Sequence, residues 1–254
     1  MTKFLTTFTA ILLITQTAAA KEFNLKWWAK ATPEQVEAEL KSGTMDVNKA
    51  VIGATLPLKA AAEACASPEV LKVLIKNGAD VNKGITEDAQ GDEQLNPTPL
   101  GSAPFCSSEV MRTLIDAGAE LNIDSGEFSL LMSVVSTGND PELVSYLIEK
   151  GANYKAGIST EDGYTEMYGM DIDGNHVLMY ALQNENPIAM IDALLKSGVD
   201  VNMPGYIYAN DQYIPITVLD YVEQQLREND PYIKVNPRLL KYLLSKGAKH
   251  ASEL

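Results

Sequence analysis

The sequence has few of the residues that build metal centres or cofactor sites. Two Cys and two His occur in 254 residues, too few thiolates and imidazoles for a dedicated zinc-type centre. Lys and Arg total 20 against 34 Asp and Glu, which gives a formal charge of −14. A chain of this charge repels phosphate backbones and anionic membrane surfaces and attracts basic proteins. We therefore expect no metal centre and no nucleic-acid partner.

Long apolar runs are also scarce, and the longest lies at the N-terminus. Lys3 precedes an apolar stretch over residues 4–14, and small residues follow up to Ala20. The stretch is shorter than the ~20 residues that span a bilayer, which disfavours the alternative of a transmembrane anchor. The pattern predicts a signal peptide over residues 1–20 and a periplasmic or secreted mature chain, 21–254, without membrane insertion.

Motifs for catalysis are missing. Residues 171–175, Asp-Ile-Asp-Gly-Asn, contain a fragment of a calcium loop, but Tyr180 stands where the loop needs a Glu. The adjacent carboxylates Glu161-Asp162 and Asp92-Glu93 are more typical of solvated loops than of an acid–base pair; a hydrolase that uses them is a rival hypothesis. We expect His176 to cap or pack a helix. The chain is predicted to be no enzyme.

One phrase recurs along the chain: an apolar pair, two polar residues, Gly, a small residue, an acidic or polar residue, an apolar residue and Asn. Its apolar spacing predicts the end of a buried helix, and its Gly predicts a left-handed residue that terminates that helix. Successive glycines lie 33 to 49 residues apart. The phrase appears in whole or in part at 40–48, 74–82, 114–122, 147–153, 194–202 and 243–248.

A shorter helix is predicted upstream of each phrase. It opens as Leu-Pro-Leu-Lys-Ala-Ala-Ala at 56–62 and as Thr-Pro-Leu-Gly-Ser-Ala at 98–103, where Thr98 is the expected N-cap. The two phrases together resemble the ankyrin repeat, whose consensus opens Thr-Pro-Leu-His-x-Ala-Ala and closes Gly-Ala-Asp-Val-Asn. The His of that opening is absent, and its positions hold Lys59, Gly101, Met132, Met179 and Asp220.

The resemblance covers nearly all of the mature chain. It implies an all-α ankyrin-repeat solenoid of about six helix-pair units with long finger loops, which binds another protein and needs no cofactor. Residues 27–34 resemble an N-terminal cap in which Thr32 and Pro33 begin the second helix. The units are expected at about 23–48, 49–82, 83–122, 123–154, 155–202 and 203–250.

Three finger loops are longer than the usual repeat requires: Lys83–Pro97, Tyr154–Asn175 and Met203–Ile216. The second and third are rich in Tyr, and the second is acidic. Insertions on one side of a solenoid often form its binding surface. The alternative is that the Tyr side chains cover the stack, and the partner then binds the first helices near Lys59, Met132 and Met179. The predicted partner-binding residues are Tyr164, Tyr168, Asp171, Asp173, Tyr206, Tyr208 and Tyr213.

The two cysteines fall at equivalent places. Within the repeat, Cys65 and Cys106 each end the first helix of adjacent units. Stacked layers lie ~10 Å apart, whereas a disulfide needs Cα atoms within ~7 Å. In an exported protein thiols placed in this way tend to oxidise, so we favour a disulfide over the alternative of two free thiols.

These observations favour an exported, monomeric, non-enzymatic binding module that supports or regulates a periplasmic partner protein. One alternative is an immunity-type protein that neutralises a toxic, basic enzyme acting on the cell envelope. Another is an effector directed to a host cell. The acidic charge slightly favours the immunity role, because many enzymes that degrade the cell envelope are basic.

Overall fold

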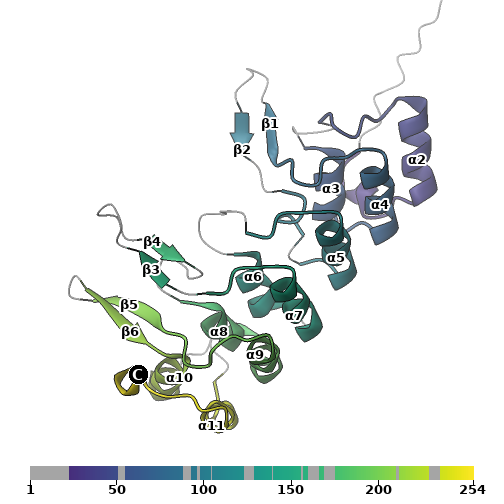
Figure 1. The fold of residues 1–254 in the computed structure, drawn as a ribbon. Helices are drawn as coiled ribbons and strands as arrows, with labels where there is room; N and C mark the ends of the chain where they lie inside the picture. Colours follow the sequence, from purple (N-terminus) through teal and green to yellow (C-terminus); the bar gives the residue numbers. More distant parts are fainter. Residues whose placement is uncertain are drawn as a thin grey trace, which may run out of the picture.

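Helices of this chain stack in layers, and hairpins project from one side of the stack. In the computed structural model the first helices lie toward the hairpins and the second helices line the other side (Figure 1). Among the described residues no helix is both long and apolar enough to cross a membrane. The structure describes residues 23–50, 55–87, 93–95, 98–103, 105–122, 129–138, 140–155, 157–159, 166–168, 175–209, 212–228 and 235–254.

A layer consists of a first helix, a turn and a second helix, and we name each layer by its expected residue range. First helices are α1 (Leu25–Trp28), α3 (Pro57–Glu63), α6 (Leu130–Thr137), α8 (Val177–Tyr180) with its 3-10 extension η2 (Ala181–Gln183), and α10 (Val218–Glu228). Second helices are α2 (Pro33–Ser42), α4 (Pro68–Lys76), α5 (Ser108–Asp116), α7 (Pro141–Glu149), α9 (Pro187–Lys196) and α11 (Pro237–Ser245). The chain ends with the 3-10 helix η3 (Ala251–Glu253).

Second helices are amphipathic and share one kind of ending. In α4, Val70, Leu71 and Leu74 are buried in the core. The helix ends where Gly78 donates its N–H to the Ile75 carbonyl and Ala79 donates to the Leu74 carbonyl, an ending that requires a left-handed residue. The predicted left-handed glycines are confirmed in every second helix: Gly43, Gly78, Gly118, Gly151, Gly198 and Gly247 have positive φ.

In the N-terminal layer, the second helix begins where the sequence predicts, at Thr32 and Pro33. Thr32 accepts a hydrogen bond from the Gln35 backbone, and the Gln35 side chain accepts one from the Thr32 backbone, so this capping box begins α2. Trp28 is fully buried, and the Trp27 and Phe23 rings pack around it. These aromatic rings close the open end of the stack, as expected of an N-terminal cap.

The first helix predicted at 98–103 is not formed. Thr98 accepts a hydrogen bond from the Gly101 backbone at 3.1 Å, so the expected cap is present, but the chain continues as turns. Gly101 is a poor helix former, and Pro104 disfavours a helical conformation for Ala103. Leu100 and Ala103 are nevertheless buried, so the turns fill the core of this layer where a helix was expected.

The finger loops contain antiparallel hairpins, so the term all-α fits the stack but not the fingers. Each hairpin is a separate two-stranded sheet. The first hairpin pairs β1 (Ile85–Glu87) with β2 (Glu93–Leu95), the second pairs β3 (Gly157–Ser159) with β4 (Glu166–Tyr168), and the third pairs β5 (Gly205–Ala209) with β6 (Gln212–Ile216).

Asparagines at the end of the repeated phrase link most neighbouring layers. The Asn82 amide donates to the Gly118 carbonyl at 3.1 Å and accepts from the Glu120 backbone at 2.8 Å. Asn48, Asn122 and Asn202 make the same pair of contacts with the layer that follows each of them. Lys155 occupies the corresponding position between layers 123–154 and 155–202, so this one position lacks the asparagine.

Cys65 and Cys106, the pair expected to be bonded, form a disulfide with Cα atoms 5.2 Å apart. Cys65 has a φ of 50° and occupies the left-handed position that ends α3. Its N–H donates to the Ala62 carbonyl, and Ala66 donates to the Ala61 carbonyl, as in a glycine-terminated helix. The close approach of the Cα atoms therefore occurs where a sharp left-handed turn meets a layer that lacks its first helix.

Candidate protein-binding surface

Among the described residues the third finger contains the longest hairpin. Its strands pair over five positions, from Gly205 opposite Ile216 to Ala209 opposite Gln212, and the other hairpins pair over three each. Because side chains alternate along a strand, Ile207 and its partner Ile214 share one face. Positions 206, 208, 213 and 215 share the other face.

This finger exposes apolar side chains. Ile207 is 41% exposed, Ile214 40% and Tyr213 38%, while Pro215 is also exposed and Tyr206 is half-buried. From residue 203 to 217 the sequence contains a single charged residue, an Asp at 211. Aromatic and aliphatic side chains with little charge are typical of the centre of a protein interface. We call the group Tyr206, Ile207, Tyr213, Ile214 and Pro215 the finger surface.

A polar cluster fixes the base of this finger. Thr217, directly after β6, is buried, and its hydroxyl donates to the Lys249 carbonyl at 2.8 Å. The Asp220 carboxylate accepts hydrogen bonds from the backbone of Thr217 and of Ala251, each at 2.9 Å. His250 Nδ1 lies 2.7 Å from the same carboxylate. This C-terminal latch, Thr217, Asp220, His250 and Ala251, ties the end of β6 and the start of α10 to the last residues of the chain.

The latch shifts the titration of both of its ionisable groups. The hydrogen bond to Asp220 raises the pKa of His250, and the carboxylates of Glu223 and Glu253 act in the same direction against the effect of burial. Burial alone would raise the pKa of Asp220, but the backbone N–H groups of Ala251 and Thr217 and the His250 ring outweigh it and lower that pKa. A protonated His250 therefore favours the closed latch.

The structure places only some of the predicted partner-binding residues. Tyr206, Tyr208 and Tyr213 come together on one face of the third finger, although the Tyr208 side chain is not among the parts described. Tyr168 lies in β4 opposite Gly157, and only its backbone is described. Tyr164, Asp171 and Asp173 lie outside the described residues.

The alternative surface on the first helices is closed. Lys59 is 9% exposed, Met132 1% and Met179 3%. The Lys59 ammonium lies 3.1 Å from the Glu63 carboxylate, so its charge is compensated within α3. His176, fully buried, accepts a hydrogen bond from the Leu178 backbone at 3.2 Å and caps α8. These positions serve the fold and offer a partner no accessible surface.

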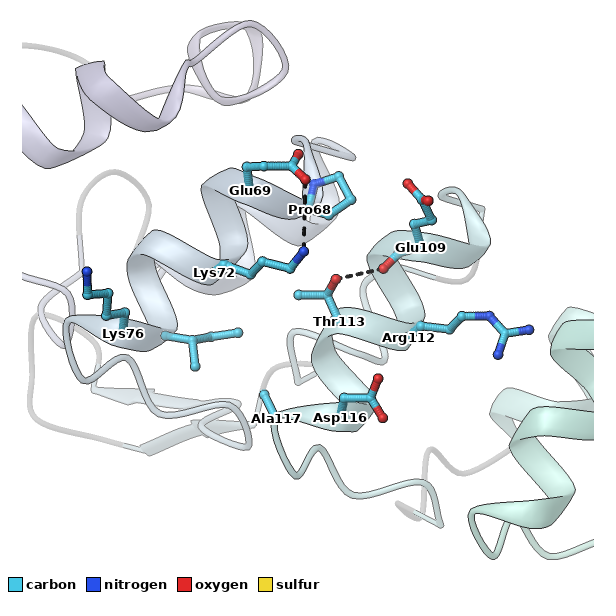
Figure 2. Close-up of a pocket in the computed structure, with 10 residues that line it drawn as sticks. Pro68, Glu69, Lys72, Lys76, Glu109, Arg112, Thr113, Asp116 and Ala117 are labelled. Carbon is cyan, nitrogen blue, oxygen red and sulfur yellow. Dashed lines mark hydrogen bonds and ion pairs between the residues drawn. The ribbon is translucent and has the colours of Figure 1, made fainter.

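A groove of about 510 Å³ lies on the opposite side of the stack, between α4 and α5 (Figure 2). Four of its charged side chains are engaged locally: Lys72 pairs with Glu69, Arg112 stacks on the Tyr146 ring at 4.2 Å, and Asp116 pairs with Lys150. Hydrogen bonds from Tyr146 and Lys150 lower the pKa of Asp116. Among the described residues no cluster of three or more His, Cys, Asp or Glu side chains could hold a metal ion. The groove is therefore a seam between two second helices, and its side chains do not converge on a ligand.

Sequence reasoning missed the aliphatic half of the finger surface. All predicted partner-binding residues are Tyr or Asp, whereas Ile207 and Ile214 are as exposed as Tyr213. The signal was present, because residues 205–216 alternate β-branched and aromatic residues around a two-residue turn without flanking charge. Phe105, 79% exposed beside Cys106, was also missed.

The comparisons with known proteins agree with this geometry. A family model described as ankyrin repeats (3 copies) matches residues 102–204. A search of curated proteins finds no match. The repeated Gly-terminated helices, the asparagine links and the projecting hairpins extend the same organisation to both sides of the matched stretch. The chain is an ankyrin repeat protein, a helical repeat solenoid of the kind that serves as a protein–protein interaction module.

Proposed function

We propose that this protein is an exported, monomeric, non-enzymatic module of six repeat units that docks a partner protein on its fingers and supports or regulates that partner in the periplasm. The observation that carries the proposal is the finger surface. Exposed Ile207, Ile214 and Tyr213 stand on a hairpin that the fold of the layers does not require. Their base is held by the C-terminal latch, so the surface is presented on a fixed support.

The net charge supports a basic partner. The chain has a net charge of −14, and five of its carboxylates lie in the segment between residues 154 and 175, which has Lys155 as its one basic residue. Carboxylates speed the encounter of a protein with a basic partner, while uncharged apolar side chains supply the retained contact. Neutralising Asp171 and Asp173 is therefore expected to slow association and to flatten its salt dependence.

Two features of the chain support export. Residues 1–20 have the composition of a cleaved signal peptide. The disulfide between Cys65 and Cys106 is of the kind that persists in oxidising compartments. N-terminal sequencing of the protein from a periplasmic fraction is expected to begin at Lys21, and a start at Met1 or recovery from the cytosol would contradict export.

The central experiment is capture of the partner from periplasmic extract with the tagged mature protein. The variant Tyr206→Ala/Tyr208→Ala is expected to weaken binding by about 2 kcal/mol or more and to leave the melting temperature nearly unchanged. Lys72→Ala, on the groove between α4 and α5, is the matched control and should bind like the wild type. Binding that is indifferent to the finger variant, or a finger variant that unfolds, would contradict docking on this surface.

The activity of the captured partner distinguishes an accessory role from an immunity role. An accessory module is expected to maintain or raise the activity of the captured partner. An immunity-type protein, which the acidic charge also favours, is expected to abolish the activity of a basic enzyme when the two are mixed in equal amounts.

A further inference from the structure

Among the described residues, one strand edge of the third finger is open and the other is partly blocked. In an antiparallel hairpin, opposite residues alternate between pairs that bond to each other and pairs whose N–H and C=O groups point away from the partner strand. Ala209 and Gln212 close a two-residue turn and must be a bonded pair, because the residues between them are adjacent in the chain. Ile207 with Ile214 is then also a bonded pair.

The outward-pointing backbone groups therefore belong to the alternate positions. On β5 these are Tyr206 and Tyr208, and on β6 they are Tyr213 and Pro215. Proline has no N–H, so the outer edge of β6 lacks one donor, which is a common way to protect an edge strand. The edge of β5 contains no Pro and no charged residue, and neither edge of the hairpin pairs with a third strand among the described residues.

We propose that β5 is a docking edge, and that the partner adds an extended segment to it as a third strand through the backbone N–H and C=O groups of Tyr206 and Tyr208. This inference rests on the proposed function and names the form in which the partner is bound. Main-chain bonds to an edge strand supply affinity, and alternate side chains supply specificity.

The charge and composition of the finger define the added segment. One of its faces would lie beside Ile207 and the other beside the Tyr206 and Tyr208 positions, so β-branched or aromatic residues are expected at alternate positions. Lys or Arg residues at its ends would complement the chain charge of −14. A second copy of this chain is the less favoured occupant, because it repeats the same negative charge.

The test uses the mature protein and a short capped peptide of alternating Val and Thr with Lys at both ends. Hydrogen exchange measured by NMR is expected to slow at least about fivefold at the amides of Tyr206 and Tyr208 when peptide is added. The Ile207 and Ile214 amides, already bonded across the hairpin, should change little. The same peptide with Glu at both ends is the matched control and should bind more weakly.

Backbone and side-chain contributions are separated by a pair of variants. Tyr206→Thr keeps the N–H and removes the ring, whereas Tyr206→Pro removes both, so the Pro variant should bind the Lys peptide about tenfold more weakly than the Thr variant. Retained protection of the Ile207 and Ile214 amides shows that the hairpin is intact. If Tyr206→Pro loses that protection, the pair Tyr208→Thr and Tyr208→Pro replaces it. Pro215→Val, which restores a donor on β6, should leave affinity unchanged.

Several outcomes overturn the inference. Protection at Tyr213 in place of Tyr206 and Tyr208 would assign the docking edge to β6. Protection of Tyr206 and Tyr208 without peptide, together with a concentration-dependent dimer, would assign the edge to a second copy. Equal binding by the Thr and Pro variants, with capture of the partner still lost in Tyr206→Ala/Tyr208→Ala, would retain docking on the finger and exclude strand addition. Capture that ignores every finger variant would contradict the proposed function itself.

Discussion

Two junctions of the stack are bridged at the same place, the turn between first and second helices, by different chemistry. Between layers 49–82 and 83–122 the bridge is the disulfide of Cys65 and Cys106. Between layers 123–154 and 155–202 it is the Asn184 side chain, whose amide donates to the carbonyls of Val135 at 2.9 Å and Gly138 at 2.7 Å. Asn184 is 3% exposed, and its partners are carbonyls in the last turn of α6 and at Gly138, the residue that caps the helix.

The other end of each junction also differs. At the finger end, the first junction has the Asn82 link to Gly118 and Glu120. The second junction has Lys155 at that position and the long second finger beside it. The layer with a missing first helix is therefore joined to its neighbour at both ends, at one of them covalently. Among the described residues, the two layers at the largest insertion are joined by side-chain hydrogen bonds at one end and by the packing of α7 on α9 and of α6 on α8.

The largest expected effect is loss of the covalent bridge. The disulfide encloses a separation of 41 residues, so Cys106→Ser with Cys65→Ser should lower the free energy of unfolding by about 2–4 kcal/mol. Chemical denaturation of the protein from an oxidising compartment measures it. Mass spectrometry without reductant should first show two hydrogens fewer than the reduced form; two alkylatable thiols in the denatured protein would contradict the bond.

A glycine variant sharpens this prediction. Cys65 holds a left-handed conformation that costs a non-glycine residue roughly 1–2 kcal/mol. Cys65→Gly with Cys106→Ser should therefore be about 1 kcal/mol more stable than the double Ser variant, although both lack the bridge. Equal stability of the two variants would indicate that the turn relaxes once the bond is absent.

Asn184 should give the next largest effect. Asn184→Ala removes the donors for buried carbonyls at the end of α6 and should cost about 1–3 kcal/mol. Asn186→Ala is the matched control, because the Asn186 side chain makes no capping hydrogen bond at the start of α9. Similar losses of unfolding free energy in the two variants would show that Asn184 is not a specific bridge.

The repeated phrase made most of the fold predictable from sequence, because Gly endings and buried apolar stripes follow from short-range chemistry. Thr32 and His176 were likewise placed correctly as helix caps. The helix predicted at 98–103 was wrong because the Thr-Pro-Leu opening indicates a helix start, while Gly101 and Pro104 in the same short segment disfavour a helix. Local propensity overcame the motif there.

The disulfide was predicted from the equivalent places of the two cysteines, but the local geometry of the bridges was harder to foresee. Cys65 stands in a left-handed position where Gly is usual, and Asn184 bonds to residues nearly fifty positions earlier in the chain. Neither arrangement has a local signal, because each depends on how two layers meet. The aliphatic finger residues Ile207 and Ile214 could have been identified from their alternation, but exposure is set by how far the hairpin projects from the stack.

Restoring the missing asparagine is expected to stabilise the second junction. Lys155→Asn would place an amide where Asn82, Asn122 and Asn202 each link to the next layer, here near the carbonyl of Gly198. The gain in unfolding free energy should be about 0.5–1.5 kcal/mol. Lys155→Ala is the control for loss of the Lys charge. If the two variants are equally stable, the Tyr154 ring, whose hydroxyl lies near Gly198, prevents the link from forming.

The smallest expected effect is the pH dependence of the C-terminal latch. The two bridges, a disulfide and an Asn amide, do not titrate near neutrality, whereas the latch contains His250. His250 has a raised pKa in the folded chain, so its stabilising contribution is fully present below its ordinary value of 6.5 and is lost as pH rises through the folded pKa. The lowered pKa of Asp220 gives the opposite limit, with stabilisation present above 3.8 and lost as pH falls through the folded value. The latch should therefore be tightest between these limits.

His250→Asn tests this prediction because its amide can replace the Nδ1 donor without a charge. After correction for the intrinsic rate, the wild-type protein should lose protection of the Ala251 amide against hydrogen exchange as pH rises above 6.5 and through the folded pKa of His250, while His250→Asn should show little change. Glu253→Gln should lessen the pH dependence only slightly, since Glu253 is a minor contributor to the shift. An identical pH profile for wild type and His250→Asn would show that the latch depends on the Thr217 and Asp220 hydrogen bonds alone. The base of the third finger would then be held by groups whose charge does not change over that range.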